Sequence, residues 1–354
     1  MKAWVLTDIG DIRLEAWEKP VPGPGEVLLQ VRAAGICGSD IPRIYQTGAH
    51  VHPLVPGHEF SGIVVEAGEG TDSGWLGKRV GVFPLIPCGS CEPCLQRRYE
   101  MCRHYDYLGS RRDGGFAEYV RVPVDNLAEL PGSVSFEEAA MLEPMAVAVH
   151  AMRRVMPGPS DSIAICGMGT IGLLLLMFLL EAGDMQASPR GRILVVGNKE
   201  FQKREVLKLG LPEACWCDSR RQNADAWLEE RTGGRGVDVF FECVGKKETL
   251  TQAVEHTAAG GRICLVGNPA LDMLLERDVY WKILRNQLTV TGTWNSSFTR
   301  EKTDDWHYVL DRLAGKKIAP GGLITHRFPL EELEKGFHMM RDKSGDYVKI
   351  MGIL

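Results

Sequence analysis

The sequence lacks the features that mark nucleic-acid-binding, membrane-spanning and secreted proteins. Its 41 lysines and arginines are outnumbered by 46 acidic residues, giving a formal net charge of −5, and no basic run offers a field for nucleic acid. The longest apolar run, 171–180, is broken by Gly172 and is far shorter than the roughly 20 residues that cross a bilayer. The first residues show no signal-peptide apolar core or cleavage site. We therefore expect a cytoplasmic protein with neither a nucleic-acid nor a membrane partner.

Internal repeats, low-complexity tracts and disordered linkers are also absent. The chain has 354 residues, a length that favours two domains, and its 44% hydrophobic and 25% charged residues are ordinary for a globular protein. Ten cysteines would suggest disulfides in a small secreted protein. In a long chain without a signal peptide they favour metal binding instead.

Residues 1 to about 130 have the pattern of a β-rich domain. In the segment 25–31, Val27, Leu29 and Val31 alternate with other residues and share one face, and a proline- and glycine-rich turn precedes them. Further short strands are expected at 61–67, 78–83 and 116–122. Many short strands separated by glycine-rich turns predict a partly closed barrel.

Four cysteines lie close together between the strands expected at 78–83 and 116–122. They are Cys88, Cys91, Cys94 and Cys102. Four thiolates at this spacing can close a tetrahedral zinc site that leaves no position for water. We therefore predict a structural zinc ion in this loop.

Cys37 and His58 suggest a second metal site of a different kind. Both are residue types that zinc accepts, and neither belongs to a CxxC or HxxxH pair. Ligands far apart in sequence are more typical of catalytic zinc. The segment 135–138 is a capping box that predicts one helix ending near Pro157. Glu143 interrupts the apolar stretch of this helix, where a carboxylate needs a partner, and is a candidate third ligand. The alternative is that each is an ordinary core or helix residue.

From residue 161 the pattern changes to alternating strands and helices. A buried strand at 162–166 leads into Gly167-x-Gly169-x-x-Gly172, which opens an apolar helix, and this context predicts a dinucleotide-binding turn. Five more strands are expected at 192–197, 214–217, 237–243, 262–266 and 288–293. Six parallel strands with helical crossovers form a doubly wound sheet. The alternative is an α/β domain that binds no nucleotide.

In combination, the two metal motifs and the glycine turn resemble those of the zinc-dependent medium-chain alcohol and polyol dehydrogenases, in the same order. The resemblance implies a GroES-like β-rich catalytic domain over 1–153 and 295–354, and a doubly wound Rossmann domain with a six-stranded parallel sheet over 154–294. The last helix, 330–341, and last strand, 347–353, would then return to the first domain. Within the family, members acting on galactitol 1-phosphate are most similar at 35–45, 48–50, 57–62 and 107–119.

The resemblance also implies roles for the metal-site residues. It places a catalytic zinc on Cys37, His58 and Glu143, with Glu59 as an alternative ligand or a close neighbour, and a structural zinc on the four-cysteine loop. Two zinc ions per chain are expected. Ser39 would take the substrate proton, and His50 would continue that relay. We also expect a homo-oligomer, either a homodimer or a homotetramer.

The cofactor is expected to be NADP or NAD. The residues expected to bind it are Gly167, Gly169, Thr170, Ile171, Gly172, Gly197, Asn198, Lys199, Lys203, Val244, Val266, Gly267 and Thr293. The strand that ends at Gly197 lacks the acidic residue that binds the ribose 2′-hydroxyl in NAD enzymes, and Lys199 and Lys203 follow it. A cation there accommodates a 2′-phosphate, which favours NADP, although NAD held by its pyrophosphate stays open. The connection 183–191 is longer than is usual in the family.

The reaction implied is hydride transfer between a secondary alcohol and NAD(P). A polyol phosphate such as galactitol 1-phosphate would give a keto-sugar phosphate such as tagatose 6-phosphate. The residues expected to contact this substrate are Arg43, His50, Arg111, Arg112 and Asn295. A free polyol, a diol or an amino alcohol is the alternative substrate. A non-catalytic nucleotide-binding sensor or scaffold is the alternative of another class.

Overall fold

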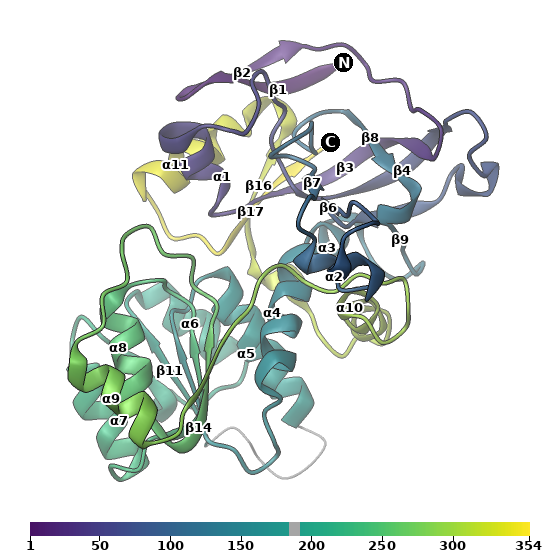
Figure 1. Cartoon of the computed structure of the whole chain (residues 1–354). Helices are drawn as coiled ribbons and strands as arrows, with labels where there is room; N and C mark the ends of the chain where they lie inside the picture. Colours follow the sequence, from purple (N-terminus) through teal and green to yellow (C-terminus); the bar gives the residue numbers. More distant parts are fainter. Residues whose placement is uncertain (184–191) are drawn as a thin grey trace. The chain divides into compact units, whose positions relative to one another are not determined.

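The computed structural model describes residues 1–183 and 192–354 and divides them into two compact units (Figure 1). The first contains Met1–Ala146 and Ser296–Leu354, and the second contains Val147–Asn295. The boundaries expected from the sequence lie after residues 153 and 294. Apart from Gly183, the long connection noted in the sequence lies outside the described residues. No helix within the described ranges is long and apolar enough to cross a membrane.

The first unit is built on a sheet of seven strands within the described residues, ordered β16-β17-β3-β4-β5-β9 with β8 paired to β3. Its strands are β3 (Glu26–Ile36), β4 (Glu59–Ala67), β5 (Arg79–Val82), β8 (Tyr119–Pro123), β9 (Leu127–Glu129), β16 (Ile324–Pro329) and β17 (Lys349–Ile353). Two strand pairs accompany it, namely β1 (Lys2–Asp8) with β2 (Asp11–Ala16) and β6 (Leu85–Ile86) with β7 (Asp106–Tyr107). The final strand, β17, lies antiparallel to β3.

The pairing of β3 with β4 positions the residues of the predicted catalytic site. Val27, Leu29 and Val31 are buried in the core of this unit, as their alternation predicts. β3 continues beyond the predicted segment to Ile36, and Gly35 near its end pairs with Glu59 at the start of β4. Cys37 therefore follows one strand at the point where His58 precedes its neighbour.

Helices and short turns accompany these strands. They are α1 (Asp40–Pro42), a π-helical turn (Arg43–Thr47), α2 (Glu92–Leu95), α3 (Phe136–Ala140), α4 (Leu142–Val155), α10 (Asp305–Ala314) and α11 (Glu334–Asp342), with 3₁₀ turns at Ser73–Trp75, Tyr99–Met101, Val124–Asn126, Pro320–Leu323 and Leu330–Glu332. Helix α4 continues into the residues of the second unit. The predicted capping box is confirmed, because Ser135 accepts a hydrogen bond from Glu138 N and the Glu138 carboxylate accepts one from Ser135 N. The single predicted helix is instead two, and they meet at Met141, just before Glu143.

The second unit contains the predicted doubly wound parallel sheet. Its six strands in the described residues are β10 (Ile163–Cys166), β11 (Ile193–Gly197), β12 (Trp216–Asp218), β13 (Val237–Glu242), β14 (Thr257–Leu265) and β15 (Thr289–Gly292). Its helices are α5 (Thr170–Gly183), α6 (Glu200–Lys208), α7 (Ala224–Thr232), α8 (Lys247–Glu255) and α9 (Arg277–Arg285), with a 3₁₀ turn at Glu213–Cys215. Figure 1 shows α8 and α9 on one side of the sheet and α5 on the other. The order β12-β11-β10-β13-β14-β15 reverses between β10 and β13, where such sheets bind ligands.

Candidate active site

The four cysteines predicted to bind a structural metal come together in one loop. Their sulfur atoms all lie within 4.8 Å of one another. Cys91 Sγ is 3.4 Å from Cys94 Sγ and 3.9 Å from Cys102 Sγ, and Cys88 Sγ is 3.9 Å from Cys94 Sγ. A disulfide needs about 2.05 Å, whereas a tetrahedral zinc with bonds of about 2.3 Å spaces its sulfurs about 3.8 Å apart. The spacing fits a metal site.

Backbone hydrogen bonds prepare one thiol of this loop for metal binding. The N–H groups of Ser90 and Cys91 lower the pKa of Cys88 to about 5, so that thiol ionises easily. Burial raises the pKa of Cys94 to about 12. A metal ion beside Cys94 would offset that effect, because it stabilises the thiolate. With four sulfurs around one point, the loop leaves no ligand position for a substrate.

The second cluster joins Cys37, His58 and Glu59. One potential ligand atom from each lies within 4.8 Å of the other two. His58 and Glu59 are buried, Cys37 is half-buried, and the exposed Ser39 hydroxyl donates a hydrogen bond of 3.3 Å to Cys37 Sγ. A thiolate, an imidazole and a carboxylate form a donor set that zinc accepts, with room for a further ligand.

The buried carboxylate of Asp40 lies beside both Cys37 and His58. It is fully buried and accepts hydrogen bonds from Cys37 N at 3.0 Å and from Arg43 Nη1 at 2.6 Å. It also lies 3.3 Å from His58 Nδ1, although the geometry makes no hydrogen bond and Nδ1 has no other partner in the described structure. A carboxylate beside one ring nitrogen is the usual support of a metal-binding histidine, and it leaves Nε2 to ligate.

Burial and nearby charge act in opposite directions on His58. Burial lowers its pKa, but Asp40 and Cys37 outweigh burial and raise that pKa well above its ordinary value. The cluster therefore concentrates negative charge around a buried imidazole. A divalent cation would neutralise the same charge, so the electrostatics also fit a metal.

Glu59 is held by a lysine from the end of the chain. Lys349 Nζ donates to Glu59 Oε2 at 2.5 Å and to Ile36 O at 3.2 Å, and its side chain is 2% exposed. Burial lowers the pKa of Lys349, but Glu59 and Cys37 outweigh it and raise that pKa. A charged, buried ion pair thus lies next to Cys37 and His58.

Glu143 lies near the cluster but outside its ligand spacing. The 4.8 Å set contains Glu59 and not Glu143. Glu143 is nevertheless buried, and burial, opposed by His58 and assisted by Glu59, raises its pKa to about 7. A carboxyl with a perturbed pKa beside a metal cluster is a candidate for function.

The glycine-rich turn of the second unit has the conformation that a dinucleotide requires. Gly167 has φ of +99°, and a Cβ there would lie 2.6 Å from Val244 Cγ2. A Cβ at Gly172 would lie 2.0 Å from Gly167 O, so the first turn of α5 packs against the loop. A Cβ on Gly169 would meet nothing within 4 Å, which leaves open space at the start of α5, where pyrophosphate binds in such folds.

A buried glutamate shapes the neighbouring cofactor loops. Glu242 accepts hydrogen bonds from Val244 N, Gly245 N and Thr249 Oγ1 at 2.8–2.9 Å. Its carbonyl accepts from Val266 N and Gly267 N, which ties the end of β14 to the end of β13. Thr293 Oγ1, beyond β15, is buried with no hydrogen-bond partner among the described residues. A bound cofactor can supply the missing partner, so these residues fit a dinucleotide.

The residues expected to select between NAD and NADP have definite contacts. A Cβ on Gly197 would lie 2.2 Å from the Trp216 ring. Packing against that ring is therefore enough to require glycine at this position, whether or not a cofactor is bound. Lys203 Nζ is 2.5 Å from Glu213 Oε1 and is therefore already paired. The Lys199 ammonium lies 5.4 Å from the Phe201 ring centre, and Asn198 is exposed.

Known proteins match the chain over both units. Residues 23–132 match the model of the alcohol dehydrogenase GroES-like domain, and 172–315 match that of zinc-binding dehydrogenase. Galactitol 1-phosphate 5-dehydrogenase of Escherichia coli K12 is 33% identical over 94% of each chain. Sorbitol dehydrogenase of Halalkalibacterium halodurans is 32% identical over 99% of this chain and 98% of that protein.

Solved structures of similar proteins share the fold of this chain. The crystal structure of galactitol-1-phosphate dehydrogenase from Escherichia coli has a TM-score of 0.90 at 30% identity, with all of both chains covered. A zinc-binding dehydrogenase from Sinorhizobium meliloti 1021, bound to NADP, has a TM-score of 0.87 at 28% identity over 100% of this chain and 99% of that one.

The chain belongs to the zinc-dependent medium-chain alcohol dehydrogenases. As a member of this family the dehydrogenase uses zinc and NAD(P). The expected fold, family and enzyme class are therefore confirmed.

The predicted substrate residues of the dehydrogenase have different surroundings. Arg43 is paired with Asp40, and Arg112 is paired with Glu26 at 2.9 Å. The Arg111 guanidinium stacks over the Tyr105 ring, 4.8 Å from its centre. His50 lies exposed, and Asn295 ends the second unit with φ of +55°.

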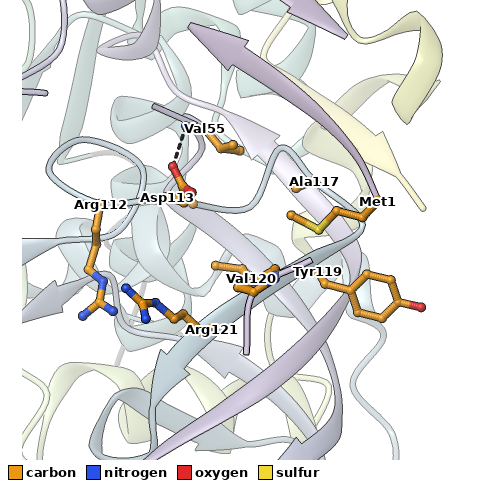
Figure 2. Close-up of a pocket in the computed structure, with 10 residues that line it drawn as sticks. Met1, Val55, Arg112, Asp113, Ala117, Tyr119, Val120 and Arg121 are labelled. Carbon is orange, nitrogen blue, oxygen red and sulfur yellow. Dashed lines mark hydrogen bonds between the residues drawn. The ribbon is translucent and has the colours of Figure 1, made fainter. Parts of the chain in front are cut away.

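One pocket of the first unit is separate from the zinc clusters of the dehydrogenase. Figure 2 shows it beside Asp113, whose carboxylate accepts a hydrogen bond from Val55 N at 2.9 Å. Its lining residues are Met1, Pro20, Val55, Arg112, Asp113, Gly114, Ala117, Tyr119, Val120 and Arg121. None of them is a predicted metal ligand, so the pocket is not where the reaction would occur.

Three buried charged residues that support the two candidate sites of the dehydrogenase were not predicted from its sequence. They are Asp40, Glu242 and Lys349. Asp40 follows the short segment Gly38-Ser39, whereas Glu242 and Lys349 each lie at the end of, or within, an apolar stretch, as Val348-Lys349-Ile350 illustrates. That pattern is the signal that could have found the latter two, because a buried charge needs a partner.

Proposed function

We propose that this dehydrogenase oxidises a secondary alcohol of a polyol phosphate, of the galactitol 1-phosphate type, to the corresponding keto-sugar phosphate. The observation that carries the proposal is the buried cluster of Cys37, His58 and Glu59 in a chain of this family. The similarity to galactitol 1-phosphate 5-dehydrogenase, over 94% of both chains, supports a phosphorylated substrate.

The proposal assigns two metal sites. Cys37 and His58 would hold the catalytic zinc with Glu143 as the third ligand, while Glu59, neutralised by Lys349, would lie beside it as the alternative ligand. Cys88, Cys91, Cys94 and Cys102 would hold the structural zinc. When bound, zinc acts as a Lewis acid that lowers the pKa of an alcohol, and NAD(P)⁺ accepts a hydride.

We propose that residues of this chain accept the substrate proton and pass it on. As the alcohol becomes a ketone, its carbon gives a hydride to NAD(P)⁺ and its hydroxyl gives a proton to the Ser39 hydroxyl. Ser39 passes a proton of its own onward, so the net products are ketone, NAD(P)H and H⁺. Ser39 suits this role because it is exposed and its hydroxyl donates a hydrogen bond to Cys37 Sγ. We propose that His50, also exposed, carries the proton to solvent.

The proton relay can be tested at Ser39. Ser39→Ala should lower kcat about a hundredfold, the lower end of what a positioned acid–base group contributes, without changing zinc content. Ser39→Thr keeps the hydroxyl and should retain most activity. If Ser39→Ala keeps wild-type kcat, or loses zinc, the relay assignment is wrong.

We propose NADP as the preferred cofactor. The basis is the absence of an acidic residue at the end of β11 and the presence of Lys199 after it. Because Trp216 fills the space at Gly197, the acid is better introduced at the exposed Asn198. Asn198→Asp should shift the kcat/KM ratio toward NAD by repelling the 2′-phosphate. A wild-type kcat/KM at least about tenfold higher with NAD would contradict the preference, a difference of about 1.4 kcal/mol.

A free polyol is the second candidate substrate, because sorbitol dehydrogenase is nearly as similar to the chain. A panel of phosphorylated and free polyols, assayed with both cofactors and with or without chelator, distinguishes the two. Faster turnover of free sorbitol or galactitol than of galactitol 1-phosphate would favour the second candidate.

We also propose that the dehydrogenase forms a homodimer or homotetramer through β15. This strand ends the six-stranded sheet, and Val290 on it is 39% exposed. Apolar side chains near it in sequence are also exposed, namely Tyr280, Trp281, Leu284 and Trp294. An open strand edge tends to pair with another chain. Val290→Lys should lower the molecular mass measured in solution. A wild-type protein that already has the mass of a monomer would contradict the proposal.

A further inference from the structure

Three arginines were predicted to contact the substrate, and their partners in the structure differ. Arg43 Nη1 lies 2.6 Å from Asp40 Oδ1, whose side chain is fully buried. Arg112 Nη2 lies 2.9 Å from Glu26 Oε1, and its Nη1 lies 3.8 Å from Asp106 Oδ2. Both guanidinium groups are thus neutralised by carboxylates, which would repel a phosphate dianion.

Arg111 is different. Within the described residues it forms no ion pair, and its buried Nε has no hydrogen-bond partner. Its guanidinium stacks over the Tyr105 ring at 4.8 Å. A ring satisfies the face of a guanidinium and leaves the N–H donors at its edge for another group. A half-buried cation whose buried Nε–H is unpaired is a poor structural element, because a buried donor without a partner destabilises the fold.

The loop that carries Arg111 also reaches the catalytic cluster. Arg111 N donates a hydrogen bond to Tyr107 O at 2.9 Å. The Tyr107 ring meets the His58 ring edge-on at 6.0 Å, and the Tyr105 ring at 6.1 Å. The pKa of His50 is lowered, first by partial burial and then by the charges of Arg111 and Arg43. His50 therefore lies within the electrostatic reach of both arginines. Arg111 therefore belongs to the surroundings of His58 and His50.

We propose that Arg111 is the anion-binding residue of the substrate site, where it holds the phosphate of a phosphorylated polyol, and that Arg43 and Arg112 only stabilise the fold around it. This inference rests on the proposed function. The planar fork of arginine binds two phosphate oxygens at once, and its position beyond Tyr107 separates the phosphate from the carbon that reacts near His58. Arg111 would thus determine specificity without taking part in hydride or proton transfer.

The test compares galactitol 1-phosphate with galactitol in the full-length, zinc-loaded enzyme. Arg111→Ala and Arg111→Gln should lose about ten- to a hundredfold in kcat/KM on the phosphorylated substrate, mainly through KM, as expected for a lost charge-assisted contact. On galactitol the change should stay within about twofold. Arg111→Lys should recover part of the loss, because lysine keeps the charge but not the fork. Arg112→Ala is the matched control and should not discriminate between the substrates.

A second measurement does not depend on turnover of the free polyol. Inorganic phosphate should inhibit the wild type competitively against galactitol 1-phosphate, and Arg111→Ala should weaken that inhibition about tenfold. A wild type that prefers galactitol overturns the phosphorylated substrate itself. A wild type that prefers the phosphate, combined with an Arg111→Ala variant that loses equally on both substrates or not at all, overturns only the role of Arg111.

Discussion

The two metal clusters of this dehydrogenase are built in opposite ways. The four-cysteine cluster comes from one loop, residues 88–102, and its sulfurs are brought together by short-range turns. The cluster of Cys37, His58 and Glu59 depends on the pairing of β3 with β4 and on Lys349, which lies 290 residues after Glu59. One site can form wherever its loop closes, whereas the other exists only when the whole first unit is folded.

Their neighbours differ in the same way. Beside the cysteine loop, Arg103 and Glu92 form an ion pair whose side chains are 62% and 65% exposed. Beside the catalytic cluster, Lys349 and Glu59 are 2% and 1% exposed. Water screens the first pair and not the second. The difference predicts that supporting residues matter much more at the catalytic cluster than at the loop.

The largest effects should come from the metal ligands themselves. Cys37→Ser should remove one of two zinc ions and lower activity at least about a thousandfold, because the Lewis acid is worth several kcal/mol, while the protein stays folded. Cys91→Ser should remove the other zinc and lower thermal stability, because a structural site contributes folding energy directly. Zinc content, activity and melting temperature are measured on each variant.

Equal effects of Cys37→Ser and Cys91→Ser on zinc content, activity and stability would contradict the difference between the two clusters. One zinc ion or none in carefully prepared wild-type protein would show that a cluster was wrongly assigned. A Cys37→Ser variant that unfolds while Cys91→Ser remains as stable as the wild type would reverse the assigned roles.

Breaking the buried ion pair should have the next largest effect. Lys349→Ala leaves Glu59 buried without its cation, and breaking such a pair typically costs about 3–5 kcal/mol. The free energy of unfolding of the first unit is measured by denaturant titration. The double variant Lys349→Met with Glu59→Gln removes both charges and should regain much of the lost stability. A loss below about 1 kcal/mol for Lys349→Ala would mean that the pair is screened like a surface pair.

Much of the fold was predictable because its signals are local. The glycine turn, the capping box at Ser135 and the cysteine spacing each involve residues within about one helical turn or one loop. The strands of the parallel sheet were also found, because buried parallel strands appear as apolar runs.

What the sequence did not reveal depends on contacts between distant residues. No spacing links Lys349 to Glu59, and only the pairing of β17 with β3 brings them together. The Trp216 ring against Gly197 likewise follows from tertiary packing, whereas the break at Met141 has a local cause, because Pro144 has no N–H to continue the helix from α3. Charges were predicted but their partners were not, which is why Arg43 and Arg112 first looked equivalent to Arg111.

Replacing Asp40 should have a smaller effect on the catalytic cluster than replacing a metal ligand. Asp40→Asn removes the carboxylate charge beside His58 Nδ1 but keeps the shape of the side chain. Losing such a support usually costs ten- to a hundredfold in metal affinity, about 1.4–2.7 kcal/mol. Competition with a chelator should therefore remove one zinc ion per chain more easily, while the cysteine-bound zinc is retained. Equal retention of both ions would show that Asp40 does not support the metal site.

The smallest effect is expected at the exposed pair beside the cysteine loop. Arg103 adjoins Cys102, and its Nη2 lies 2.8 Å from Glu92 Oε2 in the same loop. Because both side chains are mostly in water, Arg103→Ala should change stability by less than about 1 kcal/mol. The zinc should also be retained, since the four sulfurs are positioned by backbone turns such as Leu95 N to Cys91 O at 3.0 Å. Zinc content and melting temperature are measured together with those of Lys349→Ala. Loss of zinc from Arg103→Ala would show that the loop, too, depends on side-chain support, and the contrast between the two clusters would then disappear.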